Sequence, residues 1–205
     1  MTDSDHTRSF SRVTRYYSQQ FLQAMGIYGA EFPPDSRLSV PRIRALLQDG
    51  SYQLIVAQQD RQVIGFALIW VSRRPVFVHL DYIAVAHEWK GEGIGTALYR
   101  WLLARLANFH PRAQLLTLEV DDSLIGFYQR SQTKLLHETP YLFPGPLGPV
   151  PMNLMVHDTR GRSTLDRAAV RGIMRGLYCG LHGRSSEDVS LQSCLNTLPA
   201  QIFLT

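Results

Sequence analysis

The sequence predicts an α/β (α+β) domain followed by a C-terminal helical extension. Between residues 9 and 158, short runs rich in β-branched and aromatic residues alternate with segments whose apolar residues recur at helical spacing. From Arg160 onward the β-rich runs give way to a pattern of amphipathic helix. We therefore expect a flexible N-terminal tail at 1–8, a folded domain at 9–158 and a helical extension at 159–205.

Length and composition indicate a globular protein with its own core. The 205 residues are 45% hydrophobic and 19% charged, which is the composition of a folded domain. No apolar run approaches the roughly 20 residues of a membrane span. The N-terminus, MTDSDHTRSF, lacks the apolar core of a secretion signal. We expect a cytoplasmic protein that does not associate with membranes.

The cysteines and the charge give weaker indications. Cys179 and Cys194 lack the spacing of metal ligands, so we expect reduced thiols and no metal site. The formal charge is +4, and the basic residues are scattered along the chain. Scattered charge does not favour nucleic-acid binding. It is compatible with a polyanionic ligand, which needs only a local positive site.

The first forty residues predict a strand and two helices. Ser9 to Thr14 is β-rich, and Arg15 to Ile27 predicts a helix. The apolar side of that helix would carry Tyr17, Phe21, Leu22 and Met25. The stretch EFPPDSRLS is expected to form a turn, because its paired prolines cannot continue a helix. Ser39 then caps a short helix that runs through Leu47 and ends at Gly50.

A hairpin and a third strand follow. YQLIVAQ and QVIGFALIW are β-rich runs joined by the polar QDR, and PVFVHLDYIAV is the next strand, with SRRP as its turn. After a glycine-rich loop, Thr96 to Phe109 predicts an amphipathic helix. Its buried face is expected to hold Leu98, Trp101, Leu102, Arg105 and Phe109.

The rest of the domain alternates strands with one short helix. QLLTLEV predicts a strand, SLIGFYQR a short helix, and KLLHE and MNLMVH the final strands. Between those final strands, TPYLFPGPLGPVP is expected to be an irregular loop. In the extension, Leu165, Ala169, Ile173 and Leu177 form an apolar stripe opposite Arg167, Arg171 and Arg175. This pattern indicates a helix docked on the domain, a homodimer element or a partner-binding helix.

The glycine-rich loop lies between a strand and a helix, in HLDYIAVAHEWKGEGIGTALYRWL. It lacks the Lys-Ser/Thr pair of a Walker A loop, and neither register fits G-x-G-x-x-G. It does fit basic-x-x-G-x-G through Lys90, Gly91, Gly93 and Gly95. Glycines expose backbone N–H groups, and the helix start adds unpaired N–H groups with a positive dipole end. The loop therefore suits a pyrophosphate.

The stretch YIAVAHEWKGEGIGTAL resembles the acyl-CoA-binding motif of the GNAT superfamily of N-acetyltransferases. The order of the expected elements resembles that family from about residue 10 to residue 157. The resemblance implies a central mixed, largely antiparallel sheet flanked by helices, with acetyl-CoA as the acyl donor. Its pyrophosphate would bind the amides of Gly91, Glu92, Gly93, Ile94, Gly95 and Thr96 beside Lys90. Its pantetheine arm would pair with Ile83, Ala84 and Val85, where this strand and the strand ending at Val120 separate.

The resemblance also implies an acetyltransferase that acts on a primary amine. Neither cysteine lies near the glycine-rich motif, which favours direct attack of the amine on the thioester over transfer through a cysteine. Tyr128 is the expected acid for the leaving thiolate, because a phenol can donate a proton to it. Glu119 is the leading candidate for the base. Asp81 and His79, which share a face of the preceding strand, remain alternatives, as does a chain of waters.

The acceptor pocket would be built from 16–35 and 139–151, and the acceptor would be a small-molecule or peptide amine. Those segments carry the aromatic residues Tyr17, Tyr28, Phe32, Tyr141 and Phe143, with Glu31 and Asp35 available for a cationic amine. The sequence QRSQTK after Tyr128 lacks the Gly-Phe pair usual in the family. This keeps open a catalytically silent acyl-CoA-binding sensor or scaffold, and nucleic-acid binding through Arg160 to Arg175 is a third hypothesis.

Overall fold

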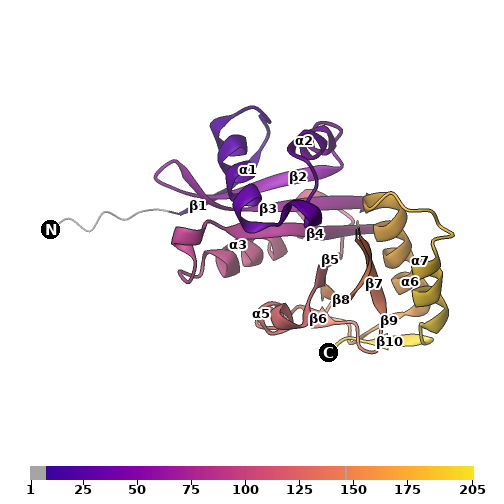
Figure 1. Cartoon of the computed structure of the whole chain (residues 1–205). Helices are drawn as coiled ribbons and strands as arrows, with labels where there is room; N and C mark the ends of the chain where they lie inside the picture. Colours follow the sequence, from indigo (N-terminus) through magenta and orange to yellow (C-terminus); the bar gives the residue numbers. More distant parts are fainter. Residues whose placement is uncertain (1–7, 146) are drawn as a thin grey trace. The chain divides into compact units, whose positions relative to one another are not determined.

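The computed structural model describes residues 8–145 and 147–205 and contains an eight-stranded mixed sheet (Figure 1). The strands follow the order β1-β2-β3-β4-β5-β8-β6, and β7 pairs with β8. The ladder between β4 and β5 is parallel, whereas β1–β2, β2–β3, β5–β8, β6–β8 and β7–β8 are antiparallel. The expected mixed, largely antiparallel sheet flanked by helices is confirmed. Residues 1–7 of the expected tail lie outside the described residues.

The chain divides into two compact units. The first contains residues 8–70 and 81–104, and the second contains residues 71–80 and 105–205. Strands β3 and β4 each contribute residues to both units. The whole segment 159–205 belongs to the second unit, together with β5 to β8.

The elements that contribute to the first unit follow the expected order. They are β1 (Ser9–Val13), α1 (Gln19–Glu31), η1 (Pro34–Ser36), α2 (Val40–Gln48), β2 (Tyr52–Gln59), β3 (Gln62–Arg73), β4 (Val76–Val85), η2 (His87–Trp89) and α3 (Ile94–Leu103). In Figure 1, α1 and α2 lie on one face of this part of the sheet and α3 on the other. The face toward α3 buries Ala57, Ile64 and Ile94, with Phe10, Val85 and Trp89 packed against them.

Helix α1 begins and ends four residues later than the sequence predicts. The Ser18 hydroxyl accepts a hydrogen bond from Phe21 N (3.3 Å), so Ser18 is the cap and the helix cannot start at Arg15. Its C-terminal end extends to Glu31 because Arg37 donates to the carbonyl oxygens of Gly29 and Phe32. Of the expected apolar side, Phe21 and Met25 are buried, whereas Tyr17 and Leu22 are exposed.

The helix expected over 96–109 is two helices, α3 and the one-turn α4 (Leu106–Phe109). Arg105 leaves the helical conformation (φ −123°, ψ 21°). Leu98, Leu102 and Leu106 are nevertheless all buried at a spacing of four. Hydrophobic spacing therefore cannot reveal this break, because the burial pattern continues across it.

The remaining elements belong to the second unit. They are β5 (Leu115–Val120), η3 (Asp122–Leu124), α5 (Ile125–Gln129), β6 (Lys134–Leu135), β7 (Tyr141–Gly145), β8 (Gly148–Asp158), β9 (Thr164–Asp166), α6 (Arg167–Arg175), a π-helix (Gly176–Leu181), α7 (Val189–Thr197) and β10 (Gln201–Phe203). Contrary to the sequence prediction, most of 139–151 is an ordered hairpin between β7 and β8. Its prolines fall in alternate pairs, Leu142↔Pro151 and Pro144↔Pro149. Because hydrogen-bonded and non-bonded pairs alternate in an antiparallel ladder, these prolines need not remove a hydrogen bond from it.

The C-terminal extension is helical, as expected, and also contains a small sheet of β9 and β10. The predicted stripe is largely buried, with Leu165, Ile173 and Leu177 almost inaccessible, and Arg167 and Arg175 lie on the exposed side of α6. Leu165 lies in β9, ahead of the helix. In the described part of the chain, no helix is both long enough and apolar enough to cross a membrane.

Candidate active site

The glycine-rich loop lies at the N-terminus of α3, as the sequence predicts. Gly93 is the N-cap residue with φ +75°, and Gly91 has φ +87°, a region that L side chains rarely adopt. A Cβ at either position would meet no atom within 4 Å. The first intrahelical bond runs from Ala97 N to Gly93 O (2.9 Å), so the N–H groups of Ile94, Gly95 and Thr96 precede the first helical bond. The loop has the open backbone that an oxyanion ligand needs.

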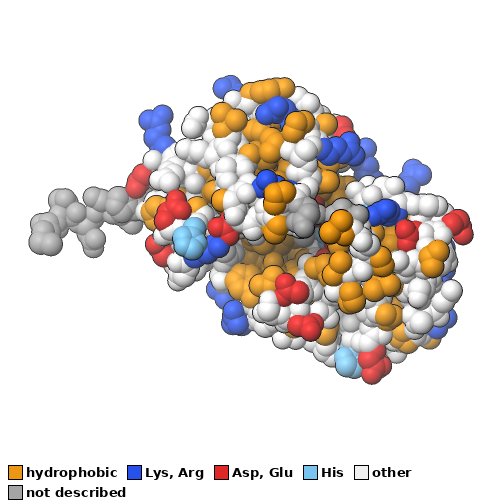
Figure 2. All heavy atoms as spheres, viewed as in Figure 1, with side chains coloured by type: hydrophobic (Ala, Val, Ile, Leu, Met, Phe, Trp, Pro, Cys, Tyr) orange, Lys and Arg blue, Asp and Glu red, His pale blue; other side chains and the backbone are white. Residues whose placement is uncertain are grey.

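Two ion pairs surround this loop. Lys90 Nζ bonds to Glu31, which was expected in the acceptor pocket. Arg8 bonds to the carboxylate of Glu92 and donates to its carbonyl oxygen (3.3 Å). Figure 2 shows acidic, basic and histidine side chains gathered at this end of the first unit. Arg8 therefore adds a positive charge that sequence reasoning missed, since no spacing relates it to the motif.

The backbone expected to bind pantetheine is the end of β4. Ile83, Ala84 and Val85 are half-buried. Strand β3 approaches them closely, because a Cβ on Gly65 would lie 3.0 Å from Ala84 O. Ala86 N donates to Ile64 O (2.9 Å) directly after β4. These contacts fix the path of the β4 backbone up to the glycine-rich loop.

The leading candidate base, Glu119, lies in a buried cluster within the second unit. Its side chain is 4% exposed. One carboxylate oxygen accepts from Tyr141 OH and lies 3.3 Å from His182 Nε2, and the other lies 3.7 Å from His79 Nε2. His79 Nδ1 lies 2.9 Å from Thr117 Oγ1. The structure thus brings Glu119 and His79 together.

The electrostatics of this cluster keep the carboxylate charged. Burial would raise the pKa of Glu119, but the hydrogen bond from His182, the electrostatic interactions with His79 and His182, and the Tyr141 hydrogen bond outweigh it and lower that pKa. Burial lowers the pKa of His79 to about 4, against the opposing charge of Glu119. Burial and the neighbouring Glu119 raise the pKa of Tyr141 well above its usual value. Near neutral pH the cluster therefore contains an anionic Glu119 and a neutral His79.

The other two predicted catalytic residues lie elsewhere. Asp81 belongs to the first unit, where it accepts a hydrogen bond from Tyr52 OH. Tyr128 is buried in α5 and its ring packs edge-on against Phe127, with centroids 4.9 Å apart. Burial, with a smaller contribution from Asp121, raises the pKa of Tyr128. Its hydroxyl therefore stays protonated near neutral pH.

The residues expected to form the acceptor pocket have several environments. Tyr28 and Phe32 pack with Phe66 and Tyr82 in the first unit. Tyr17 lies under the guanidinium of Arg44, with 4.4 Å between that group and the ring centroid. In the second unit, Tyr141 bonds to Glu119 and Phe143 packs edge-on against His182 at 5.0 Å. The side chain of Asp35 lies outside the described part of the structure.

His182 is the site residue that sequence reasoning missed. It lies in the C-terminal extension, 63 residues after Glu119, and no motif marks it. The only signal was its position one residue after LYCGL, at the end of the amphipathic pattern.

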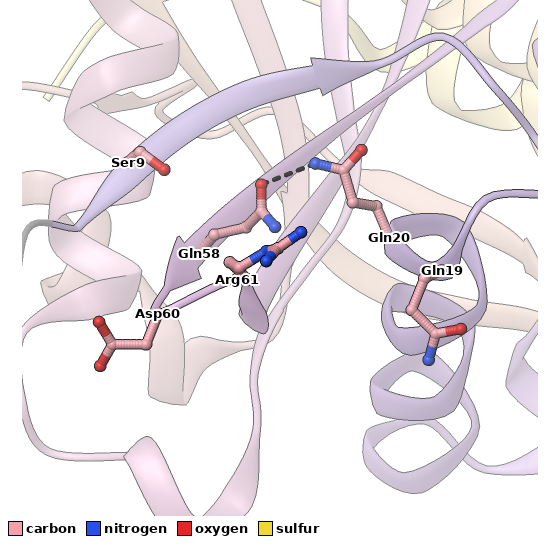
Figure 3. Close-up of a pocket in the computed structure, with 6 residues that line it drawn as sticks. All are labelled: Ser9, Gln19, Gln20, Gln58, Asp60 and Arg61. Atoms are coloured by element: carbon pink, nitrogen blue, oxygen red, sulfur yellow. Dashed lines mark hydrogen bonds between the residues drawn. The ribbon is translucent and has the colours of Figure 1, made fainter.

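A polar cavity of about 540 Å³ in the first unit is separate from these groups. As Figure 3 shows, Gln20 of α1 reaches Gln58 of β2 with a hydrogen bond of 2.7 Å. The cavity is also lined by Ser9, Gln19, Asp60 and Arg61. None of these residues belongs to the glycine-rich loop or to Ile83–Val85, so we do not assign the acyl donor to this cavity.

The two cysteines differ in their exposure to solvent. Cys179 is exposed and Cys194 is buried, and both are free thiols. Burial raises the pKa of the Cys194 thiol, which makes it a poor nucleophile. Among residues 8–145 and 147–205, no three His, Cys, Asp or Glu side chains form a group that could hold a metal ion.

Comparison with known proteins gives a consistent result. A family model described as Acetyltransferase (GNAT) family matches residues 15–132. A GNAT-family acetyltransferase from Bacteroides thetaiotaomicron superposes with a TM-score of 0.72 at 22% identity, covering 86% of this chain and 99% of that one. The ribosomal-protein-S18-alanine N-acetyltransferase of Escherichia coli gives 0.54 at 20% identity, covering 75% and 94%. An aminoglycoside 6'-N-acetyltransferase complexed with coenzyme A gives 0.59 at 14% identity, covering 75% and 98%.

One curated protein sequence, an uncharacterized protein of Dictyostelium discoideum, is 27% identical over 111 residues. The alignment covers 54% of this chain and only 25% of that protein. The matched family model covers more than half of the 205 residues, including the glycine-rich loop, Glu119 and Tyr128. The chain therefore belongs to the GNAT family of acetyltransferases.

Proposed function

We propose that this chain transfers an acetyl group from acetyl-CoA to a primary amine by direct attack of the amine on the thioester. The single observation that carries the proposal is the open glycine-rich loop at the start of α3. Gly91 and Gly93 have positive φ, and no side chain caps the helix. Backbone N–H groups in this arrangement bind phosphate oxygens. Lys90 and Arg8 add positive charge beside the loop, each through a surface ion pair that a stronger anion can replace.

The proposed reaction needs no covalent enzyme intermediate. The amine gives up a proton, its nitrogen forms a bond to the thioester carbon, and the tetrahedral intermediate expels the CoA thiolate, which takes a proton. The products are an acetamide and CoA with a free thiol. The burial of Cys194 and the raised pKa of its thiol favour direct attack over transfer through that cysteine.

We assign two roles to named residues. Glu119 belongs to the group that takes the proton from the amine, because it is a buried carboxylate that remains charged and has two histidines beside it. Tyr128 is the proposed proton donor to the thiolate, because burial keeps its phenol protonated. Asp81 is the alternative base, and its hydrogen bond from Tyr52 leaves it less suited to that role.

The acceptor is a small-molecule or peptide amine. Two structural neighbours have names that describe acetylation of a ribosomal-protein alanine and of an aminoglycoside. A first panel should therefore contain a peptide with a free N-terminal alanine, an aminoglycoside and a polyamine. Release of the CoA thiol measures turnover for all three.

The cofactor assignment is tested by calorimetric titration of acetyl-CoA into the wild type and into Gly93→Asp. The aspartate places a negative charge where the pyrophosphate is proposed to bind, so we expect at least a 100-fold loss of affinity. Gly50→Asp is the matched control, because Gly50 has φ +78° and equally open space at the far end of α2. Equal affinity in wild type and Gly93→Asp would refute the loop as the binding site. Tight binding without turnover on any amine would instead favour the acyl-CoA-binding sensor or scaffold.

A further inference from the structure

The C-terminal extension places one histidine beside the buried carboxylate of β5. His182 Nε2 lies 3.3 Å from Glu119 Oε1, and its side chain is 14% exposed, compared with 4% for Glu119. Glu119 therefore has less access to an incoming molecule than His182 has. Both carboxylate oxygens of Glu119 already face donors or rings, namely Tyr141, His182 and His79.

The backbone around His182 is anchored on both sides. Before it, Tyr178 OH donates to Leu142 O of β7. After it, Arg184 donates to Pro144 O (3.0 Å) and Gly145 O (3.2 Å) of the same strand. His182 N itself bonds to Leu177 O (2.9 Å), which closes the π-helix. These contacts hold His182 in one place without involving its side chain.

The imidazole is oriented by two further contacts. Its ring packs edge-on against Phe143, and its Nε2 faces the Glu119 carboxylate. A charged carboxylate accepts hydrogen bonds, so the neutral imidazole carries its proton on Nε2 and keeps the Nδ1 lone pair available. In the described chain no hydrogen bond to Nδ1 is present. A carboxylate likewise fixes the tautomer of the base histidine in a Ser-His-Asp triad, where the roles of the two ring nitrogens are exchanged.

We propose that His182, supplied by the C-terminal extension, takes the proton from the acceptor amine through Nδ1, with Glu119 as its positioning residue. The inference rests on the proposed acetyl transfer and assigns its deprotonation step. The amine N–H proton passes to Nδ1 as nitrogen bonds to the thioester carbon, and the resulting imidazolium is stabilised by Glu119. The proton then leaves to solvent, which restores the neutral ring.

Other titratable groups lie near His182 and Glu119. His79 approaches Glu119 from β4 and Tyr141 from β7, while Tyr178 lies on the π-helix. Asp188, Cys194 and Arg184 act on Tyr178 in turn. Of the two groups that contact Glu119 besides His182, His79 stays neutral down to about pH 4 because of burial, and the pKa of Tyr141 is raised well above its usual value. Neither of these two groups therefore changes its charge near neutral pH, so a difference in pH profile between wild type and His182→Gln comes from His182 itself.

The test compares His182→Gln with wild type on the best amine of the panel. We expect kcat to fall about 100-fold or more, the typical contribution of a general base, while calorimetric affinity for acetyl-CoA changes less than twofold. The acid limb of the kcat/KM profile should disappear, and the remaining rate should follow the fraction of free amine in solution. His137→Gln is the matched control, because His137 is an exposed histidine 3.5 Å from the carboxylate of Glu138. It should leave kcat and the profile unchanged.

Two further measurements separate a base from a merely structural residue. Glu119→Gln should lower kcat and shift the acid limb, and the double variant with His182→Gln should lose no more than His182→Gln alone, because the residues act as one unit. Independently of any acceptor, ¹⁵N NMR of the wild type at pH 8 should show His182 protonated on Nε2 and not on Nδ1. A proton on Nδ1 would overturn the inference.

The possible outcomes distinguish a failure of the proposed role of His182 from a failure of the proposed acetyl transfer. A wild type that turns over an amine, together with a His182→Gln variant of equal kcat and profile, would overturn the role of His182 and leave acetyl transfer intact. Additive losses in the double variant would also overturn it. A wild type that binds no acetyl-CoA would overturn the proposed function, and the tautomer found by NMR would still decide whether Nδ1 is available.

Discussion

At the scale of single residues, the burial of His79 predicts a pH-dependent stability. Burial lowers the pKa of His79 from 6.5 to about 4 in the folded protein. Between these values the unfolded chain binds the proton and the folded chain does not, so unfolding is favoured as the pH falls from 6.5 to 4. The shift corresponds to a loss of roughly 3 kcal/mol across that window. Urea denaturation of wild type and His79→Gln at pH 4, 5, 6 and 7 measures it.

The variant should have a smaller dependence on pH, because glutamine does not titrate. Glu119 contributes in the same direction at lower pH, since its lowered pKa gives stability that is lost below its unfolded value of 4.5. The exposed His137 serves as the control, and His137→Gln should keep the slope of the wild type. If His79→Gln also keeps that slope, the buried histidine does not titrate as described.

The sequence predicts structural features that have a local signal and does not predict contacts between distant residues. Gly91, Gly93 and the following helix could be identified because the glycines are adjacent in sequence to the helix that they open. Glu119 could be named from its strand position, but not its contacts with Tyr141 and His182, which come from 22 and 63 residues away. Contacts of that separation are set by tertiary packing, and hydrophobic spacing contains no information about them.

At the scale of elements, Gly176 lies in the π-helix at a position without room for a side chain. We therefore expect replacement of this glycine by alanine, a better helix former, to destabilise the protein. A Cβ at this position would lie 2.9 Å from Phe77 Cε1 and 3.0 Å from Phe77 Cζ, and the Phe77 ring is itself buried. We expect Gly176→Ala to lower the free energy of unfolding by roughly 1–3 kcal/mol, the typical cost of overpacking. That loss exceeds the gain of about 0.5–1 kcal/mol from replacing a helical glycine. Urea denaturation provides the measurement.

Gly126 of α5 offers the matched control. A Cβ there has only Arg130 Nη1 at 4.0 Å, the end of a flexible side chain. Gly126→Ala should therefore be neutral or stabilising. In a Phe77→Leu background, Gly176→Ala should cost less than it does in the wild type. An equal cost in both backgrounds would mean that the ring is not the obstacle.

Some helices and strands could be predicted from sequence and others could not. The β2–β3 hairpin and α2 followed the prediction because QDR and Ser39 are local turn and cap signals. The predicted bounds of α1 were wrong by four residues because its cap, Ser18, lies inside the apolar pattern. Strand β7 was missed because prolines argue against a strand, whereas the ladder places them at alternate pairs.

At the scale of the whole molecule, the extension and the strands β5 to β8 belong to one compact unit. Thr205 and Leu135 exchange backbone hydrogen bonds of 2.7 and 3.0 Å, and His137 N donates to Phe203 O (2.9 Å). The division into a domain at 9–158 and an extension at 159–205 therefore remains a prediction made from the sequence. It does not follow that residues 9–158 fold alone.

Deletion of residues 159–205 tests that point. The extension contributes many almost inaccessible side chains, namely Leu165, Val170, Ile173, Met174, Leu177, Tyr178, Leu191, Leu195, Leu198 and Ile202. Truncating one buried leucine costs about 2–5 kcal/mol, and a whole domain is stable by about 5–15 kcal/mol. We therefore expect the shortened chain to lose hydrogen-exchange protection in β7 and β8, which the full chain should show. Unchanged protection in those strands would mean that the extension is an accessory to a domain complete without it, and that His182 alone explains its effect on turnover.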